Sequence, residues 1–255
     1  MSAEYYVGTS GWHYDHWRER FYPEGLPKSK WLQHYARSFS TVELNNSFYN
    51  LPSVKAFEKW RDSSPDGFAY AVKVSRFITH MKKLRNVDEP LANFLERVRI
   101  LGDKLGPLLY QLPPNLHRKD ELLDSFLSTL PSDLAHAVEF RHASWLCQDV
   151  FAIMRRHNVG FCAFDMPDLT TPLEATADFA YIRFHGSAAL YGSCYSDEEL
   201  NDWAHRIAEL GRGLGAVYIY FNNDAEAFAV RNALTLRDRL RDIEGWSLEH
   251  PKAYG

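Results

Sequence analysis

The stretch AVEFRHASW begins as an apolar strand and ends in groups that can do chemistry. Glu139 can accept or donate a proton, and Arg141 can hold a carboxylate or a phosphate through two parallel hydrogen bonds. Because successive strand residues point to opposite faces, these two side chains share one face, and the apolar residues beside them share the other. His142 falls on the apolar parity and is expected to begin the following loop. The pattern therefore predicts an acid and a base side by side where this strand ends.

Other strand-like stretches show the same arrangement, with charged residues on one parity and apolar residues on the other. The predicted inward set holds three acids, three bases and one imidazole: Glu43, Glu139, Asp165, Lys73, Arg141, Arg183 and His185. An isolated buried ion costs several kcal/mol, whereas a whole domain is stable by only about 5–15 kcal/mol. These groups must therefore pair with one another, contact water or bind a ligand. A purely structural ion-pair network is the plain alternative, but apolar packing would usually be at least as stable.

Two of the acids point to proton transfer. Glu43 and Glu139 face one cavity in this arrangement and could serve a hydrolase as general acid and base. His185 is a second candidate proton carrier, and Asp165 completes the candidate catalytic set. The neighbouring arginines would stabilise an anionic intermediate.

The three bases indicate an anion site. Arg141 and Arg183 can grip a carboxylate or a phosphate in bidentate fashion. Lys73 could add a third donor or, if desolvated, form a Schiff base. Neutral hydrogen-bonding groups complete the candidate substrate-binding set on these strands: Asn45, Gln111, Tyr220, Asn222 and Asn223.

A metal site is another reading of the same acids. Glu43, Glu139 and Asp165, with His185, are ligand types that divalent cations accept. Three fixed cations beside them would repel Mg²⁺ or Zn²⁺, and the chain has no H-E-x-x-H motif. We therefore expect no metal ligands and no cofactor, and keep a divalent metal as the alternative.

The elements that must position these residues alternate along the chain. Strand-like stretches cover residues 5–10, 41–45, 70–75, 107–112, 136–141, 160–165, 180–185 and 216–222. Amphipathic, helix-like stretches cover 53–63, 89–102, 119–130, 149–156, 196–211 and 224–241. Ser196 with Glu199 forms a predicted capping box, and Asp224 is predicted to cap the last helix.

Eight strands mostly separated by helices predict parallel pairing through right-handed crossovers, and eight is the number that closes a barrel. The 255 residues match the ~250 typical of a (β/α)₈ TIM barrel. An open doubly wound sheet is the alternative, but no G-x-G-x-x-G follows the first strand. We predict one α/β TIM-barrel domain over residues 1–255, with a core at about 5–240 and a short tail at 245–255. The charged set would then gather at the carboxyl-terminal mouth, where this fold builds its active sites.

The loops after the strands add aromatic and basic groups over this mouth. Trp12 and Tyr191 could stack on a base or a sugar ring. A small satellite core beneath the loop is the favoured interpretation for most aromatic residues after the first strand: Trp12, Tyr14, Trp17, Phe21 and Tyr22. The basic loop at 75–85 could hold a nucleic-acid backbone, although such a run is usually a solvated surface.

Bulk properties narrow the class of protein. A formal net charge of −4 argues mildly against a protein that coats DNA. Three scattered cysteines fit reduced thiols better than a disulfide framework. No apolar run approaches the ~18–20 residues needed to cross a bilayer, and the first residues lack the basic start of a signal peptide. We expect a cytoplasmic protein without a membrane contact.

Eight ordered motifs resemble those of the YecE-like family, which is catalogued as a domain of unknown function. The motifs are GTSGWHYDHW, FYP, TVELNNSFYNLP, AVKVSRFITH, QLPPN, VEFRHASW, YIRFHG and YFNND. The resemblance runs from about residue 5 to about 240. It implies a TIM barrel related in shape to the sugar-isomerase and apurinic-endonuclease group, and it implies no settled reaction. The DNA-cutting relatives use a multi-zinc site rich in histidine, whereas this chain has one inward histidine in its strands.

Three functions follow from these patterns. The first is an enzyme, a hydrolase, isomerase or lyase, that acts on a small polar or anionic substrate, including a phosphorylated one, at the charged mouth. The second is a nucleic-acid binding or repair protein that takes a flipped base or a strand end between the loop aromatics. The third is a module that binds a metabolite without turning it over.

Overall fold

Eight parallel strands form the centre of the molecule. The computed structural model describes residues 3–167 and 169–245. The parallel strands are β1 (Glu4–Thr9), β2 (Thr41–Leu44), β3 (Ala69–Lys73), β4 (Leu105–Gln111), β5 (His136–Glu139), β6 (Gly160–Met166), β8 (Phe179–Phe184) and β9 (Ala216–Phe221). The two-residue strand β7 (Leu169–Thr170) pairs antiparallel with the end of β6. Each predicted strand is present, with its ends within two residues of the predicted ones.

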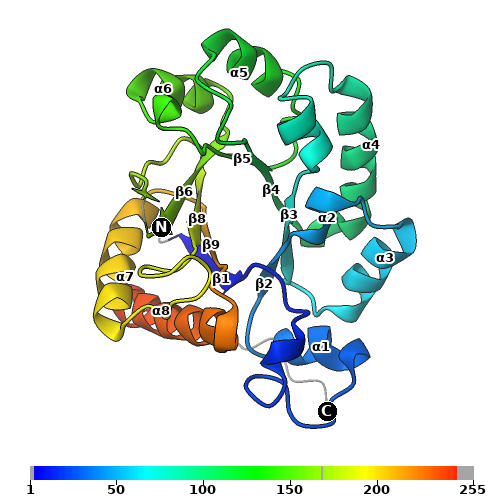
Figure 1. Cartoon of the computed structure of the whole chain (residues 1–255), viewed down its shortest axis with the longest axis vertical. Coiled ribbons are helices and arrows are strands. Elements are labelled where there is room, and N and C mark those ends of the chain that lie inside the picture. Colours follow the sequence, from blue (N-terminus) through cyan, green and yellow to red (C-terminus); the bar gives the residue numbers. More distant parts are fainter. Residues whose placement is uncertain (1–2, 168, 246–255) are drawn as a thin grey trace.

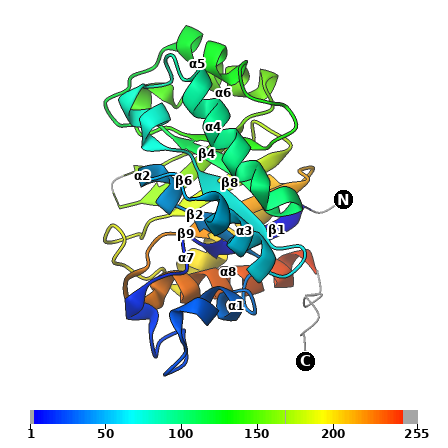
Figure 2. The same ribbon diagram turned by 90° about the vertical axis from the view of Figure 1, so that its right-hand side faces the viewer.

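Helices surround the strands on the outside, as Figures 1 and 2 show from two directions. They are α1 (Trp31–Tyr35), α2 (Asn46–Tyr49), α3 (Val54–Ser63), α4 (Asp88–Val98), α5 (Asp120–Leu127), α6 (Gln148–Arg156), α7 (Asp197–Gly211) and α8 (Phe228–Glu244). The sequence pattern does not predict α1 or α2, because neither is long enough to show a helical period. Among the described residues, no helix combines the length and the apolar character needed to cross a bilayer.

The strand order is β1-β9-β8-β6-β5-β4-β3-β2, so the sheet curls until its first and last members meet. Outward-facing side chains pack beneath the helices in one large core, which includes Val42, Val138 and Ile182. Inward-facing side chains form a separate small cluster that fills the barrel: Ala71, Leu109, Ala137, Cys162, Phe179, Tyr181 and Tyr220. The predicted TIM-barrel fold is therefore confirmed.

A tyrosine side chain closes the barrel where β1 meets β2. No main-chain ladder joins these two strands in the described sheet. The Tyr35 hydroxyl from α1 instead accepts a hydrogen bond from the Thr9 amide and donates one to the Thr41 carbonyl, each at 3.0 Å. Gly8 permits the close approach, since a Cβ at this position would lie 2.4 Å from the Thr41 oxygen. We call this junction the Tyr35 seam.

The two predicted helix caps have different outcomes. The capping box of Ser196 and Glu199 is confirmed, with hydrogen bonds of 3.1 and 2.7 Å at the start of α7. Asp224 does not cap the last helix, which is a correction. Its side chain makes no cap hydrogen bond, and α8 begins after Ala227, whose φ of 59° interrupts the helical path. The predicted tail covers residues 245–255, and all of it except Gly245 lies outside the described residues.

Candidate functional site

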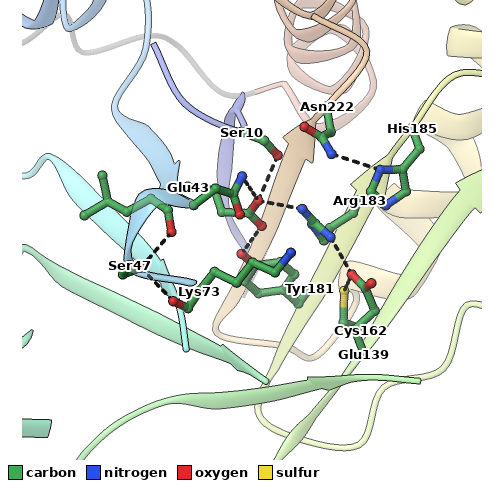
Figure 3. Close-up of polar contacts among 12 residues, drawn as sticks. Ser10, Glu43, Ser47, Lys73, Glu139, Cys162, Tyr181, Arg183, His185 and Asn222 are labelled. Atoms are coloured by element: carbon green, nitrogen blue, oxygen red, sulfur yellow. Dashed lines mark hydrogen bonds and ion pairs between the residues drawn. The ribbon is translucent and has the colours of Figure 1, made fainter. Parts of the chain in front are cut away.

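Charged side chains from four strands converge at the carboxyl-terminal end of the barrel (Figure 3). Glu43 comes from the last part of β2, Lys73 and Glu139 are the last residues of β3 and β5, and Arg183 precedes the last residue of β8. The structure brings together these four residues, which are far apart in the sequence. We call them, with Arg141 just after β5, the charged cup.

Arg183 lies between two carboxylates. Its Nη2 donates to Glu43 Oε1 at 2.8 Å, and its Nη1 donates to Glu139 Oε2 at 2.7 Å. All three side chains are at most 1% exposed. A buried ion pair needs good geometry and further hydrogen bonds to offset the loss of hydration. One guanidinium that serves two carboxylates provides that geometry and fixes the separation of the two acids.

Further donors surround Glu43. Ser10 Oγ donates to its Oε1 at 2.8 Å, and the Tyr181 hydroxyl donates to its Oε2 at 2.7 Å. Asn45 Nδ2 adds a third bond at 3.0 Å. Burial acts to raise the pKa of Glu43, but Arg183 and the nearby Lys73 outweigh it and hold that pKa below its usual value. Glu43 is therefore ionised at neutral pH.

Glu139 begins a second chain of contacts toward the mouth. Arg141 donates from Nε to Glu139 Oε1, and its Nη2 contacts His185 Nε2 at 3.0 Å. Burial opposes ionisation of Glu139, but Arg141 and Arg183 hold its pKa well below the usual value. Burial and the nearby Arg183 lower the pKa of His185 well below its usual value, so the imidazole is neutral.

The neutral state of His185 fixes its tautomer. Arginine can only donate, so Nε2 of His185 must accept from Arg141, and the ring proton must sit on Nδ1. Nδ1 lies 3.2 Å from Asn222 Nδ2, which is also a donor, so this tautomer requires the Asn222 amide to be turned over. The Nδ1 proton is satisfied when that amide presents its oxygen. His185 thus links the loop after β9 to Arg141.

Lys73 differs from the other charged groups of the cup. Within the described part of the chain it makes no ion pair and its ammonium donates no hydrogen bond. The ammonium instead lies 4.3 Å from the centre of the Phe48 ring, on α2. Burial, reinforced by Arg183, lowers the pKa of Lys73 from 10.5 to about 8. Lys73 is therefore a partly exposed cation without a counter-ion.

Two buried polar atoms beside Glu43 also lack partners. Arg183 Nε and Asn45 Oδ1 have no hydrogen bond in the described structure. Arg141 Nη1 has only the Met166 thioether sulfur, at 3.2 Å, and sulfur is a weak acceptor. Unsatisfied buried donors are uncommon in proteins, and they mark positions where water or a ligand atom is needed.

Comparison with known proteins agrees with this architecture. The profile of a family described as "Protein of unknown function DUF72" matches residues 6–253. The chain belongs to the DUF72 family. This DUF72 chain resembles the crystal structure of the DUF72 family protein TM1631 from Thermotoga maritima, with a TM-score of 0.85 and 32% identity, over 93% of this chain and 99% of the other.

Two curated relatives extend the comparison. The DUF72 chain is 26% identical to the UPF0759 protein YunF of Bacillus subtilis, over 94% of this chain and 95% of YunF. It is 30% identical to the UPF0759 protein YecE of Escherichia coli over a segment that covers 56% of this chain and 50% of YecE. The predicted YecE-like resemblance is confirmed. These names carry no reaction, so the function has to be argued from the site.

Asp165 does not face the barrel interior of the DUF72 chain, which corrects the prediction for β6. Its carboxylate accepts hydrogen bonds from the Tyr195 hydroxyl and from Thr170, both at 2.6 Å and both on the outer side of the sheet. Phe164 takes the inward position instead, where Arg141 stacks on its ring at 4.4 Å. Strand β6 is apolar on both faces, so the position of its one carboxylate does not reveal which face is inward.

Three predicted ligand-binding residues lie away from the opening. Tyr220 is fully buried inside the barrel, and its hydroxyl contacts the Thr41 hydroxyl at 2.7 Å. Asn223 is also buried and donates to the Ser193 carbonyl and to Asn232 Oδ1, so it holds the loop after β8. Trp12 is buried against Trp60, with the two rings edge to face 6.0 Å apart.

The satellite core predicted beneath the first loop is confirmed. Trp17 and Tyr22 are buried there, and Tyr22 stacks on Trp31 with the ring centres 4.4 Å apart.

Other predicted residues lie at the mouth. Gln111 ends β4 on the inward parity, in register with Glu139. Tyr191 is 43% exposed and meets the His185 ring edge to face at 5.6 Å. Asn222 contacts His185, and Asn45 donates to Glu43, as described above.

The predicted site lacks four residues that the structure places there: Ser10, Phe48, Met166 and Tyr181. Tyr181 shares the inward parity of Arg183, which is the signal that could have found it. Phe48 lies on a four-residue helix without a detectable period. Among the described residues, no three histidine, cysteine or carboxylate side chains form a group that could hold a metal ion.

Proposed function

We propose that this DUF72 protein is an enzyme that binds a small anionic substrate in the charged cup. The observation that carries the proposal is the unpaired ammonium of Lys73. Three cationic groups face two carboxylates in the cup, which leaves one positive charge in excess. A charge that is largely removed from water and has no partner is unfavourable, so the unpaired ammonium of the partly exposed Lys73 is explained if an anion completes the site.

The donors left unsatisfied suit such an anion. Lys73 Nζ on β3, Arg183 Nε on β8 and Arg141 Nη1 just after β5 have no strong acceptor. A phosphate or carboxylate group offers several acceptor oxygens and bonds well to guanidinium and ammonium groups. Donors in fixed positions lose little entropy when the ligand binds, and this favours selectivity for one shape of anion.

The carboxylates are better suited to positioning than to proton transfer. Glu43 and Glu139 were predicted as acid and base, but both are ionised and bonded to Arg183. We assign them the role of holding the arginines at a fixed spacing. Proton transfer falls to Lys73, because a group with a pKa near the working pH exchanges protons most effectively.

Anion binding is testable with inorganic ions. Phosphate at low millimolar concentration should raise the melting temperature of the wild-type protein, and Lys73→Met should abolish the increase. Lys119→Met is the matched control, because Lys119 is an exposed lysine on the loop after β4. Equal stabilisation of all three proteins would contradict the proposal. Binding without turnover of any phosphorylated or carboxylated compound in a broad panel would indicate a metabolite-binding module instead.

A second candidate function rests on the rim of the mouth. Phe77 and Met81, in the π-helical turn Phe77–Met81, and Tyr49 at the end of α2 are exposed. Lys82 lies 5.6 Å from the Phe77 ring centre, and the preceding Arg76 is exposed as well. Exposed aromatic rings beside cations are what single-stranded nucleic acid binds.

The rim hypothesis makes its own prediction. Binding of a short fluorescent single-stranded DNA should weaken steeply as salt rises, and Phe77→Ala should weaken it further. Absence of binding at low salt would eliminate this candidate and leave the anion site untouched.

A further inference from the structure

Lys73 has the surroundings of a nucleophilic amine. No carboxylate holds its ammonium in place, although Glu43 and Glu139 are both nearby. Arg183 on β8 and Arg141 just after β5 are near enough for their positive charges to lower the pKa of Lys73. His80, on the turn after β3, lies on the same side of the barrel and contacts the Phe48 ring at 5.0 Å. Lysine becomes nucleophilic when burial and neighbouring cations favour its neutral form.

We propose that Lys73 forms an imine with a small anionic carbonyl compound, of the 2-oxo acid or keto-phosphate class. This inference rests on the proposed function, because the anionic group of the compound would occupy the donors at Arg183 Nε and Arg141 Nη1. Figure 3 shows the Lys73 amine beside the Arg183 guanidinium, and Arg141 and Arg183 both donate to the Glu139 carboxylate. The arrangement holds the charged end of a short substrate while its carbonyl carbon meets the amine.

The step balances without a further reactant. The Lys73 ammonium first releases one proton to water, and the free amine adds to the carbonyl carbon as the carbonyl π pair moves to oxygen. That oxygen takes up a proton and the nitrogen releases one to water, which gives a neutral carbinolamine. The oxygen leaves as water after a second protonation, while the nitrogen lone pair forms the C=N bond. Overall, one ammonium and one carbonyl are converted into one iminium and one water, and the total charge does not change.

The site can hold the iminium product. The iminium is a cation like the ammonium it replaces, so the Phe48 ring face still stabilises it. The positive charge on nitrogen draws electrons from the neighbouring carbon–carbon and carbon–hydrogen bonds. Breaking one of these bonds is the chemistry of lyases and isomerases that use a lysine.

Lys73 is one of ten lysines in the chain, which makes its reactivity measurable against the others. At pH 7 a lysine with a pKa of about 8 has roughly 300-fold more neutral amine than one with a pKa of 10.5. Two of the other lysines are held by partners outside the charged cup. Lys104 donates to two main-chain carbonyls at 2.6 Å, and Lys28 pairs with Asp15 at 2.7 Å.

Reductive trapping with glyoxylate tests the inference. Glyoxylate is a small anionic aldehyde, and cyanoborohydride converts its imine into a stable secondary amine that peptide mass spectrometry locates. We expect Lys73 to be labelled at least about tenfold faster than the exposed lysines at pH 7. Excess phosphate should suppress this labelling. Acetaldehyde, which lacks the anionic group, should show a smaller preference for Lys73.

Variants and a parallel measurement separate the possible outcomes. Lys73→Arg keeps the charge but cannot form an imine, Lys73→Met is a second variant of similar length, and Lys119→Arg is the control. Labelling spread evenly over the exposed lysines of the wild-type protein would overturn the inference. If phosphate still raises the melting temperature in that case, the anion site stands and only the imine step is wrong. If phosphate has no effect either, both proposals fail.

Discussion

Replacing Lys73 by methionine is expected to stabilise the folded protein at neutral pH. In the folded state burial, together with Arg183, lowers the pKa of Lys73 from 10.5 to about 8. Its ammonium is therefore less favourable in the barrel than in water. Methionine has a similar length, carries no charge and packs well against an aromatic ring such as Phe48.

The magnitude follows from the two pKa values. Between pH 8 and 10.5 the unfolded chain binds the Lys73 proton and the folded chain does not, so the stability of the wild-type protein rises with pH in this window. Below pH 8 Lys73 is protonated in both the folded and the unfolded protein. Its ammonium then lowers the free energy of unfolding by a constant amount, about 3 kcal/mol for the full pKa difference. About 2 kcal/mol of this destabilisation remains at pH 9, and about 1 kcal/mol remains at pH 10.

Chemical denaturation at several pH values measures this effect. The free energy of unfolding of Lys73→Met should exceed that of the wild type by about 3 kcal/mol at pH 7, or about 6–12 °C in melting temperature. The difference should shrink between pH 8 and 10. Lys119→Met should show no such trend. A Lys73→Met protein that is less stable than wild type at pH 7, or a difference that does not vary with pH, would refute the reasoning.

Three further predictions concern the same site and its frame. Arg183→Met should cost about 3–5 kcal/mol in unfolding free energy, because it leaves the buried Glu43 carboxylate without its ion-pair partner and Glu139 with Arg141 alone. A cost below 1 kcal/mol would contradict the pairing. The pKa of Glu139 is held below its usual 4.5, so its contribution to stability is present above that pH and is lost below it. The stability difference between wild type and Glu139→Gln should accordingly narrow in denaturation curves as pH falls below 4.5. Tyr35→Phe should cost about 1–3 kcal/mol and speed hydrogen exchange at the Thr9 amide, and unchanged exchange would show that the hydroxyl does not hold the seam.

Much of the charged cup was predictable because strand alternation is a local property. Glu43, Glu139 and Arg183 each follow apolar neighbours of the opposite parity, so the inward face can be read without knowing the fold. Strand alternation gave the wrong face for Asp165. Both faces of β6 are buried, so its sequence shows no difference between a polar and an apolar face. There the polar residue faces outward to meet Tyr195, a partner more than twenty residues away that the sequence does not reveal.

The pairing inside the cup was not predictable, because it depends on distances across the barrel. The sequence shows three cations and two inward carboxylates, but not that Arg183 serves both carboxylates and leaves Lys73 alone. Phe48 shows the same limit, since a helix of one turn places its ring beside Lys73 without any periodic pattern. Trp12 could not be assigned to the mouth or to the core, since its partner Trp60 is far along the chain, on α3.

The closure of the barrel has a consequence for how the chain is made. Strand β1 is synthesised first, yet its ladder partner is β9, where Thr9 lies in register with Phe221. At about 5–20 residues per second the ribosome needs roughly 10–40 s to reach that partner. During this time β1 can bond to the Tyr35 hydroxyl of α1, but it has no ladder partner. The strand of this barrel that is synthesised first is thus the last to be paired, and a nascent chain that ends before β9 leaves the edge of β1 without its ladder partner.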